Sequence, residues 1–231
     1  MNNQDRFSFG LGLILVGLFS AILAHSVFGI RFNHIFTDNI TDLRKPAPVV
    51  VVGIDDRSLN KLGAWPFQRN IFADAVAELY DKGARLVVFD VLFLESGTRD
   101  DTLRTVIAQE PRPTIFASKL DQTGTYFPNI FSLDSNAVSA IANVYPDEDG
   151  KVRFMHYFDK DKTGNCLPTL SYRAFFEYTR KKILGCDTAA QIFVYPENRP
   201  KQLSFIDVYE KKIDPIDVKG KVVFIGSVSL D

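Results

Sequence analysis

The strongest structural signal in the sequence is Val49-Val50-Val51-Val52-Gly53-Ile54, an unbroken apolar stretch that is rich in β-branched residues and lies between Pro48 and Asp55. A strand with one solvated face would alternate apolar and polar residues, so this stretch is typical of a strand buried on both faces of a parallel sheet. Two stretches of the same character are Leu86-Val87-Val88-Phe89 and Val222-Val223-Phe224-Ile225. We expect these three strands to be partners in one sheet.

Helices are predicted between the strands. Residues 70–82 place apolar side chains at helical spacing, and Gly83 follows as a stop signal. Residues 98–109 repeat this pattern with acidic residues in the first turn, and Pro111 ends it. The next apolar stretch, residues 114–117, predicts a further strand. This succession of strand, helix and strand indicates βαβ units.

The middle of the chain has a different pattern. Residues 138–145 and 152–158 flank the turn-rich segment 146–150, which predicts an antiparallel hairpin. Residues 167–184 predict the longest helix outside the amino-terminal segment, and residues 192–195 and 203–206 predict short strands. The expected fold class is α/β, with a mixed, mainly parallel sheet flanked by helices and an antiparallel hairpin.

The two cysteines, Cys166 and Cys186, flank the helix predicted over residues 167–184. They could pair in an oxidising compartment, but 20 helical residues would separate them by about 30 Å. A disulfide needs Cα atoms within about 7 Å of each other. We therefore expect both thiols to be free.

Composition excludes several functional classes. The chain has 27 Lys and Arg residues against 28 Asp and Glu residues, and it has no clustered basic patch, which argues against nucleic-acid binding. The phosphate-binding, zinc-protease and serine-hydrolase motifs are missing. The three histidines, His25, His34 and His156, are scattered, so they support neither a metal cluster nor a catalytic triad.

Residues 7–30 contain no Asp, Glu, Lys or Arg. As a helix, these 24 residues would reach about 36 Å, enough to cross a hydrocarbon core of about 30 Å. We expect these residues to form an uncleaved transmembrane anchor, and the alternative is a cleavable signal peptide. The charges of the flanking loops do not decide the orientation of the anchor. The chain then divides into residues 1–6, the anchor 7–30, a juxtamembrane linker 31–45 and a globular domain 46–231.

Polar side chains follow the predicted strands at the edge where open α/β sheets bind ligands. They could converge on a ligand or hold Mg²⁺. In the alternative, Asp55, Asp56 and Ser58 cap the next helix and Asp90 bonds to loop backbone. Trp65 could stack on a ligand or cover the apolar edge of the sheet. The candidate ligand-binding residues are Asp55, Asp56, Asp90, Glu95, Trp65 and Ser227. No catalytic residue or metal ligand is assigned, and the sequence names no cofactor.

Six blocks in a fixed order resemble the CHASE2 family of extracytoplasmic sensory domains, and the resemblance runs through most of residues 46–227. The blocks are 51–59, 62–69, 83–95 with Asp101 and Leu103, 142–153 with its Pro146-Asp147-Glu148-Asp149-Gly150 segment, 167–171 and 220–227. The resemblance implies an amino terminus inside the cell, a membrane helix and an α/β sensor outside the cytoplasmic membrane. It also implies further membrane helices and an intracellular output such as a cyclase, a kinase or a diguanylate cyclase.

The family resemblance supplies no catalytic residues, so we expect no enzyme activity in this chain. Family members continue beyond the block that ends at Ser227, whereas this chain stops at Asp231, so we expect a sensor that is incomplete at its carboxyl end. The expected location is the bacterial inner membrane, with the domain in the periplasm or the extracellular space.

The expected function is a sensory or ligand-binding input domain of a transmembrane receptor. The alternatives are a membrane-anchored periplasmic scaffold that docks a partner and, as the weakest option, a metal-dependent hydrolase that uses the strand-end carboxylates. The expected partners are the cytoplasmic membrane and an unidentified small-molecule or protein ligand, with a homodimer as one option.

Overall fold

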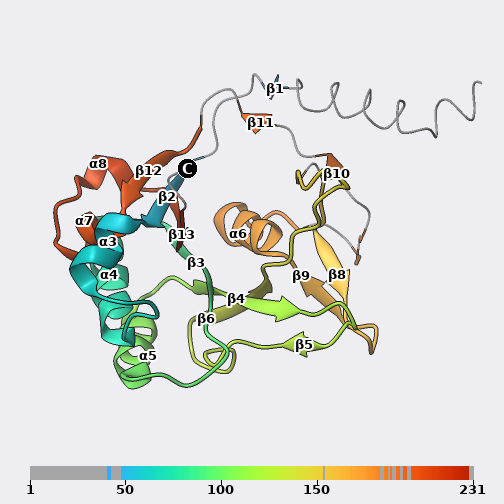
Figure 1. Ribbon diagram of the computed structural model, residues 1–231, viewed down its shortest axis with the longest axis horizontal. Coiled ribbons are helices and arrows are strands. Elements are labelled where there is room, and N and C mark those ends of the chain that lie inside the picture. The colour runs from blue at the N-terminus through green and yellow to red at the C-terminus, as the bar shows by residue number, and fades with distance from the viewer. Residues whose placement is uncertain are drawn as a thin grey trace, which may run out of the picture.

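The computed structural model describes residues 41–42, 48–152, 154–182, 185–186, 188, 191–192, 195–196 and 199–228. Its centre is a seven-stranded sheet in the order β12-β2-β13-β3-β4-β5, with β6 also paired to β4 (Figure 1). All neighbours are parallel except β4 and β5. The strands are β2 (Val49–Ile54), β3 (Leu86–Leu92), β4 (Thr114–Leu120), β5 (Tyr126–Phe127), β6 (Ala137–Ile141), β12 (Lys201–Ser204) and β13 (Val222–Ser227).

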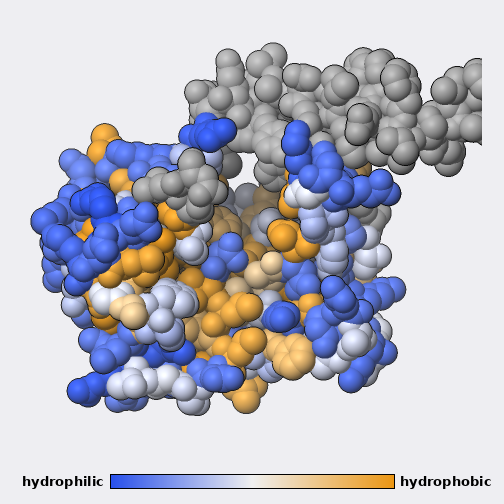
Figure 2. All heavy atoms as spheres, viewed as in Figure 1, coloured by the Kyte–Doolittle hydropathy of each residue, from blue (hydrophilic) through white to orange (hydrophobic). Residues whose placement is uncertain are grey.

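Helices cover the two faces of this sheet unequally (Figure 1). One face carries α3 (Asp56–Leu62), α4 (Arg69–Asp81), α5 (Asp100–Gln109), α7 (Phe205–Tyr209) and α8 (Pro215–Val218). On the other face, α6 (Leu170–Thr179) packs against β3, β4 and β6. Val51 of β2 and Phe224 of β13 point to this second face and are half-buried. Figure 2 shows apolar side chains gathered in the middle of the molecule, between two more hydrophilic parts.

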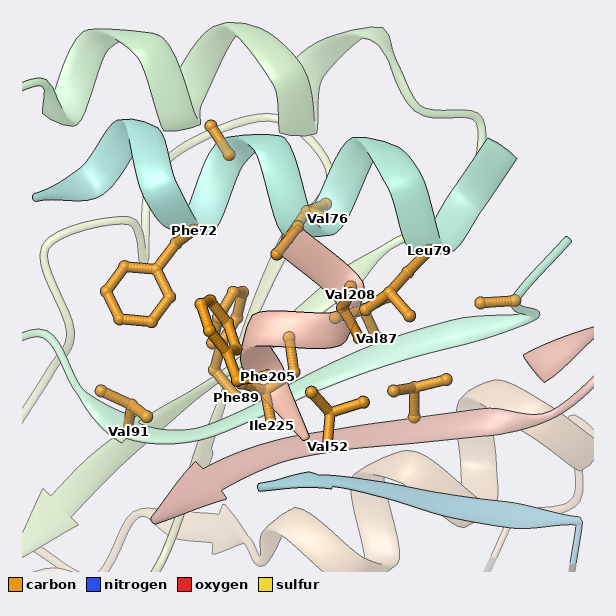
Figure 3. Packing of buried hydrophobic residues seen from close by; sticks show 14 of the residues in the cluster. Val52, Phe72, Val76, Leu79, Val87, Phe89, Val91, Phe205, Val208 and Ile225 are labelled. Atoms are coloured by element: carbon orange, nitrogen blue, oxygen red, sulfur yellow. The ribbon is translucent and has the colours of Figure 1, made fainter. Parts of the chain in front are cut away.

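The main core lies between the sheet and α4 (Figure 3). Along β3, Val87, Phe89 and Val91 join this core, whereas Leu86 and Val88 join a smaller core beneath α6. The continuous apolar stretch of β3 is therefore explained by burial on both faces, as the sequence indicated. Large aromatic side chains fill the main core without exposure: Phe72, Phe89, Phe93, Phe116, Phe131 and Phe205.

The predicted βαβ elements are confirmed with small shifts at their ends. The strand expected over residues 49–54 is β2, and the helix expected over residues 70–82 is α4. The helix expected over 98–109 begins at Asp100 as α5, and the strand expected over 114–117 extends to Leu120 as β4.

An antiparallel hairpin is present, but its position differs from the prediction. It is formed by β8 (Phe158–Lys160) and β9 (Cys166–Pro168). Instead of turning back on residues 152–158, β6 pairs in parallel with β4, and β7 (Phe154–Met155) pairs with β10 (Gln191–Ile192). A short apolar stretch does not specify its partner, and here β4 offers β6 a long edge buried on both faces.

The two short strands expected near the carboxyl end are also shifted. The stretch expected over 192–195 is divided between β10 and β11 (Tyr195–Pro196), and β11 pairs with β1 (Thr41–Asp42). The strand expected over 203–206 is β12, which ends at Ser204 because α7 begins at Phe205.

The prediction of free thiols is wrong. Cys166 and Cys186 form a disulfide, with Cα atoms 5.9 Å apart. The predicted helix over 167–184 was too long: α6 begins after its N-cap Thr169 and ends before Arg180, which adopts a left-handed conformation with φ of 60°. Among the described residues between the two cysteines, the helix α6 has ten residues. The chain can therefore reverse direction after the helix and bring Cys186 back to Cys166.

The expected membrane anchor, residues 7–30, and the segments 1–6 and 31–40 lie outside the described residues. Within the part of the chain that the structure describes, none of the helices combines the length and the apolar character needed to cross a bilayer.

Candidate functional site

Asp55 follows β2 and acts as the N-cap of α3. Its Oδ1 atom accepts hydrogen bonds from the Ser58 amide at 2.9 Å, the Ser58 hydroxyl at 2.6 Å and the Ser204 hydroxyl at 2.9 Å. Burial alone would raise the pKa of Asp55, but the hydrogen bonds from Ser58 and Ser204 outweigh it and hold the pKa below its usual value. The predicted capping role of Asp55 is confirmed.

Asp56 and Ser227 are both exposed. Asp56 lies in the first turn of α3, where a negative charge is favourable to the helix dipole. Ser227 ends β13 and pairs in register with Ile54 of β2. The structure assigns no ligand-binding role to either side chain.

Asp90 lies on the same face of β3 as α6, next to Gly226 of β13. A Cβ atom on Gly226 would lie 3.3 Å from the Asp90 Cβ atom, so glycine leaves room for the carboxylate. The neighbouring protein atoms remove part of the hydration of the Asp90 carboxylate and so raise its pKa. The residue as a whole is still exposed. The expected bond from Asp90 to loop backbone is not among the hydrogen bonds of the described residues.

Two of the predicted residues, Trp65 and Glu95, line the same cleft. This cleft of about 480 Å³ lies between the loop that precedes α4 and the loop that follows β3. Its lining residues are Trp65, Pro66, Phe67, Gln68, Arg69, Val91, Leu92, Phe93, Leu94, Glu95, Ser96, Gly97 and Thr98. It opens beyond the carboxyl end of β3, the edge at which α/β sheets usually bind ligands.

Trp65 combines the two roles considered for it. Its ring packs edge-on against Phe67 and Phe72, at centroid distances of 5.4 and 6.0 Å, and so covers the core. The residue nevertheless remains 47% exposed, and Leu92, which also lines the cleft, is 46% exposed. An anchored and partly exposed indole ring provides a rigid stacking surface for a ligand.

Arg69 forms part of the cleft wall and was not among the predicted site residues. Its Nε atom donates to Asp100 Oδ1 at 3.1 Å and its Nη2 atom to the Glu95 carbonyl at 3.2 Å. The guanidinium lies 4.6 Å from the centre of the Phe93 ring, a cation–π distance. This half-buried cation holds the β3–α5 loop against α4, which gives the cleft a fixed wall.

Gly97 makes this arrangement possible. A Cβ atom at position 97 would lie 2.9 Å from the Arg69 Cζ atom, closer than side chains pack. The sequence signal was weak, because an arginine at the start of a helix and a glycine in a loop each have many ordinary explanations. Their contact joins positions 28 apart in the sequence, so it depends on how the intervening chain folds.

The strand-end carboxylates do not form a metal centre within the described residues, since no three His, Cys, Asp or Glu side chains there are grouped as a metal ion requires. Asp55 caps α3, Glu95 lines the cleft, and Asp90 lies beside Gly226. The metal-dependent hydrolase considered from the sequence therefore has no cluster to use in this part of the chain.

The sequence model of the CHASE2 domain matches residues 11–231. The chain belongs to the CHASE2 family. CHASE2 domains are extracytoplasmic sensory domains, and the family is a sensory rather than a catalytic one. The disulfide between Cys166 and Cys186 agrees with this location, because disulfides persist mainly in oxidising compartments. Searches of curated proteins and of solved structures gave no significant match.

Proposed function

We propose that this CHASE2 chain is the sensory input domain of a bacterial transmembrane receptor and that its signal is a small molecule bound in the cleft beside Trp65. The observation that supports this proposal is a cleft of about 480 Å³, within the usual size range of small-molecule sites, with a half-exposed tryptophan on its wall. Sensory domains of this family need a recognition site, and this cleft has both an apolar wall and polar groups.

The chemistry of the cleft fits a small ligand with a flat or apolar part. Trp65, Pro66 and Leu92 supply apolar surface, whereas Gln68, Ser96 and Thr98 supply hydrogen-bonding groups. Because Arg69 is already paired with Asp100, the ligand does not need to neutralise the charge of Arg69. Aromatic stacking would give affinity, and the polar side chains would give orientation.

The relay we propose depends on the two loops that form the cleft. One loop leads into α4 and the other connects β3 to α5, so a ligand that contacts both loops favours one relative position of these elements. A ligand shifts a conformational equilibrium only by its difference in affinity for the two states. In the proposed receptor, residues 7–30 anchor the domain in the inner membrane, and an output module outside this chain receives the signal.

The test uses the full chain in detergent micelles and a library of small metabolites, with the midpoint of thermal unfolding as the readout. Compounds that bind the cleft should raise the midpoint for the wild type and lose this effect in Trp65→Ala. The matched control is Phe175→Ala, which removes an aromatic side chain that is 44% exposed on α6, away from the cleft. Ligands that stabilise Trp65→Ala as strongly as the wild type would contradict the cleft assignment.

A scaffold that docks a protein partner is the second candidate. It is favoured by the half-buried Val51 and Phe224 on the sheet face that α6 leaves less covered. If the chain is such a scaffold and docks a second copy, full chains in detergent micelles should associate, and Phe224→Asp should abolish the association. Light scattering, which gives the mass of the protein in each micelle, measures this. A chain that stays monomeric and captures a small molecule would instead support the sensory proposal.

A further inference from the structure

Two of the residues that line the cleft beside Trp65 carry a charge, Arg69 and Glu95. Arg99, the other charged residue of the loop between β3 and α5, is exposed and does not line the cleft. The charge that a ligand meets in the cleft is therefore decided by how far Arg69 and Glu95 are each compensated by their neighbours.

The charge of Arg69 is compensated within the protein. Its side chain is only 11% exposed, and its Nε atom lies 3.1 Å from Asp100 Oδ1. Its Nη2 atom donates to the Glu95 carbonyl at 3.2 Å, and Asp100 Oδ2 accepts the Gly97 amide at 2.8 Å, which fixes the carboxylate. An anionic ligand would compete with Asp100 for Arg69 and would be repelled by the carboxylates of Asp100 and Glu95. The cleft is thus unfavourable for an anion.

Glu95 is in the opposite situation. Its backbone carbonyl is held by Arg69, whereas its carboxylate accepts no hydrogen bond and forms no ion pair with any residue that the structure describes. The residue is exposed, so a ligand in the cleft can reach this carboxylate. Glu95 therefore leaves one uncompensated negative charge on the wall of the cleft, and this charge attracts cations.

Trp65 offers an aromatic surface in the same cleft. The plane of its ring makes angles of 68° and 83° with the rings of Phe67 and Phe72, so neither ring stacks flat on the indole. The residue is 47% exposed, and part of the indole stays open to the cleft. The faces of an indole carry partial negative charge, and they attract cations more strongly than the other aromatic side chains do.

The two groups lie on the two loops that form the cleft: Trp65 precedes α4, and Glu95 follows β3. Arg69 ties these loops together, because its backbone amide also donates to the Thr98 carbonyl at 3.1 Å. The indole ring and the carboxylate therefore line one space whose walls are already fixed before a ligand enters.

We propose that this cleft binds an organic cation, a quaternary or protonated amine, with its ammonium group between the Trp65 ring and the Glu95 carboxylate. The apolar part of the cation lies against Pro66 and Leu92. This inference rests on the proposed function, since it names the class of ligand for the same cleft. An ammonium group in this position contacts both loops at once, as the proposed relay requires.

The donor set of the cleft separates an organic cation from other positively charged ligands. A metal ion such as Ca²⁺ takes about six to eight oxygen ligands, and no three His, Cys, Asp or Glu side chains of the described residues are grouped as a metal ion requires. One carboxylate beside an aromatic ring is instead typical of ammonium recognition. An ammonium joined to a phosphate, as in a lipid headgroup, fits less well, because the phosphate would lie near Glu95.

Fluorescence titration of the full chain in uncharged maltoside micelles tests the proposal, because Trp65 is the only tryptophan in the sequence and its emission reports on the cleft. The probes are choline and 3,3-dimethyl-1-butanol, which has the same shape with carbon in place of the charged nitrogen. Choline should bind about three- to thirtyfold more tightly, the range expected from cation–π attraction. Added salt should weaken the binding of choline and not that of the alcohol.

Glu95→Gln removes the negative charge and keeps the shape of the side chain. It should weaken choline binding about two- to fivefold, the effect of losing one exposed ion pair, and leave the alcohol unaffected. The matched control is Glu148→Gln, which changes an exposed glutamate that does not line the cleft and should leave both affinities unchanged. Trp65→Leu, followed by calorimetry, should remove most of the preference for choline over the alcohol.

Three results would overturn the assignment of an ammonium ligand: no binding of choline, equal binding of choline and the alcohol, or choline binding that is unchanged in Glu95→Gln. Phosphocholine distinguishes the two sources of the ammonium group. It should bind more weakly than choline, and tighter binding would contradict a free cation. The proposed function has a separate outcome, because any ligand whose effect is lost in Trp65→Ala still supports the cleft as the recognition site.

Discussion

The hydroxyl group of Ser204 donates a hydrogen bond to Asp55 Oδ1 over 2.9 Å and so joins positions 149 residues apart in the sequence. Asp55 lies between β2 and α3, whereas Ser204 ends the edge strand β12. The Ser58 hydroxyl, which also donates to Asp55, accepts a hydrogen bond from the Ile206 amide over 3.1 Å. One carboxylate oxygen therefore connects the start of α3 to the start of α7.

Asp55→Ala should lower the free energy of unfolding by about 1–2 kcal/mol, because it removes an N-cap and leaves buried donors without their acceptor. Urea denaturation followed by circular dichroism measures this change. Asp56→Ala is the control: Asp56 is exposed in the first turn of α3 and should cost less than about 0.5 kcal/mol. Equal losses in the two variants would contradict the network described for Asp55.

The stability of the fold should fall in acid partly because of Asp55. Its pKa in the folded chain is below that of the unfolded chain, about 3.9, so the unfolded state takes up the proton first. The stabilisation is present above about pH 4 and is lost as the pH falls through the folded pKa. Stability measured from pH 7 to pH 2 should fall less steeply in Asp55→Asn than in the wild type. Parallel curves would show that other carboxylates account for the acid sensitivity.

Removal of the disulfide should destabilise the domain. Cys166 and Cys186 close a loop with a sequence separation of 20 residues, for which the loss of unfolded-state entropy corresponds to about 3 kcal/mol. The double variant Cys166→Ser, Cys186→Ser should therefore unfold at a lower temperature than the oxidised wild type. Thiol labelling of the denatured, unreduced chain provides the control, and two reactive thiols there would contradict the disulfide.

Phe72 should be among the most sensitive positions of the core. It is fully buried, and its ring lies 5.3–6.1 Å from five other aromatic rings: Trp65, Phe67, Phe89, Phe93 and Phe205. Phe72→Ala should cost about 3–5 kcal/mol in unfolding free energy, because it leaves a cavity beneath α4. Phe175→Ala, on the exposed side of α6, should cost far less. Similar losses, measured by chemical denaturation, would argue against this packing.

Local patterns predicted the βαβ part of the fold well. The strand β2 and the helices α4 and α5 follow from apolar periodicity and from stop signals such as Gly83 and Pro111, all of which act over a few residues. The antiparallel hairpin was placed wrongly because short strands are selected by the edges available to them. The length of α6 was overestimated because Arg180 ends the helix in a left-handed conformation that its residue type does not announce.

The candidate site was predicted only in part. Trp65 and Glu95 could be singled out from the sequence, and they do share a cleft. Arg69 and Gly97 could not, because their roles arise from contact between two loops.

The amino-acid sequence alone established the family, the α/β class, the strongest strands and helices, and the absence of common catalytic motifs, because these properties depend on composition and on patterns over short distances. Tertiary structure decided the strand order, the disulfide between Cys166 and Cys186, the bond from Ser204 to Asp55 and the walls of the cleft beside Trp65. Each of these depends on which distant segments pack together, and that choice is made by burial of the whole apolar surface rather than by any local preference.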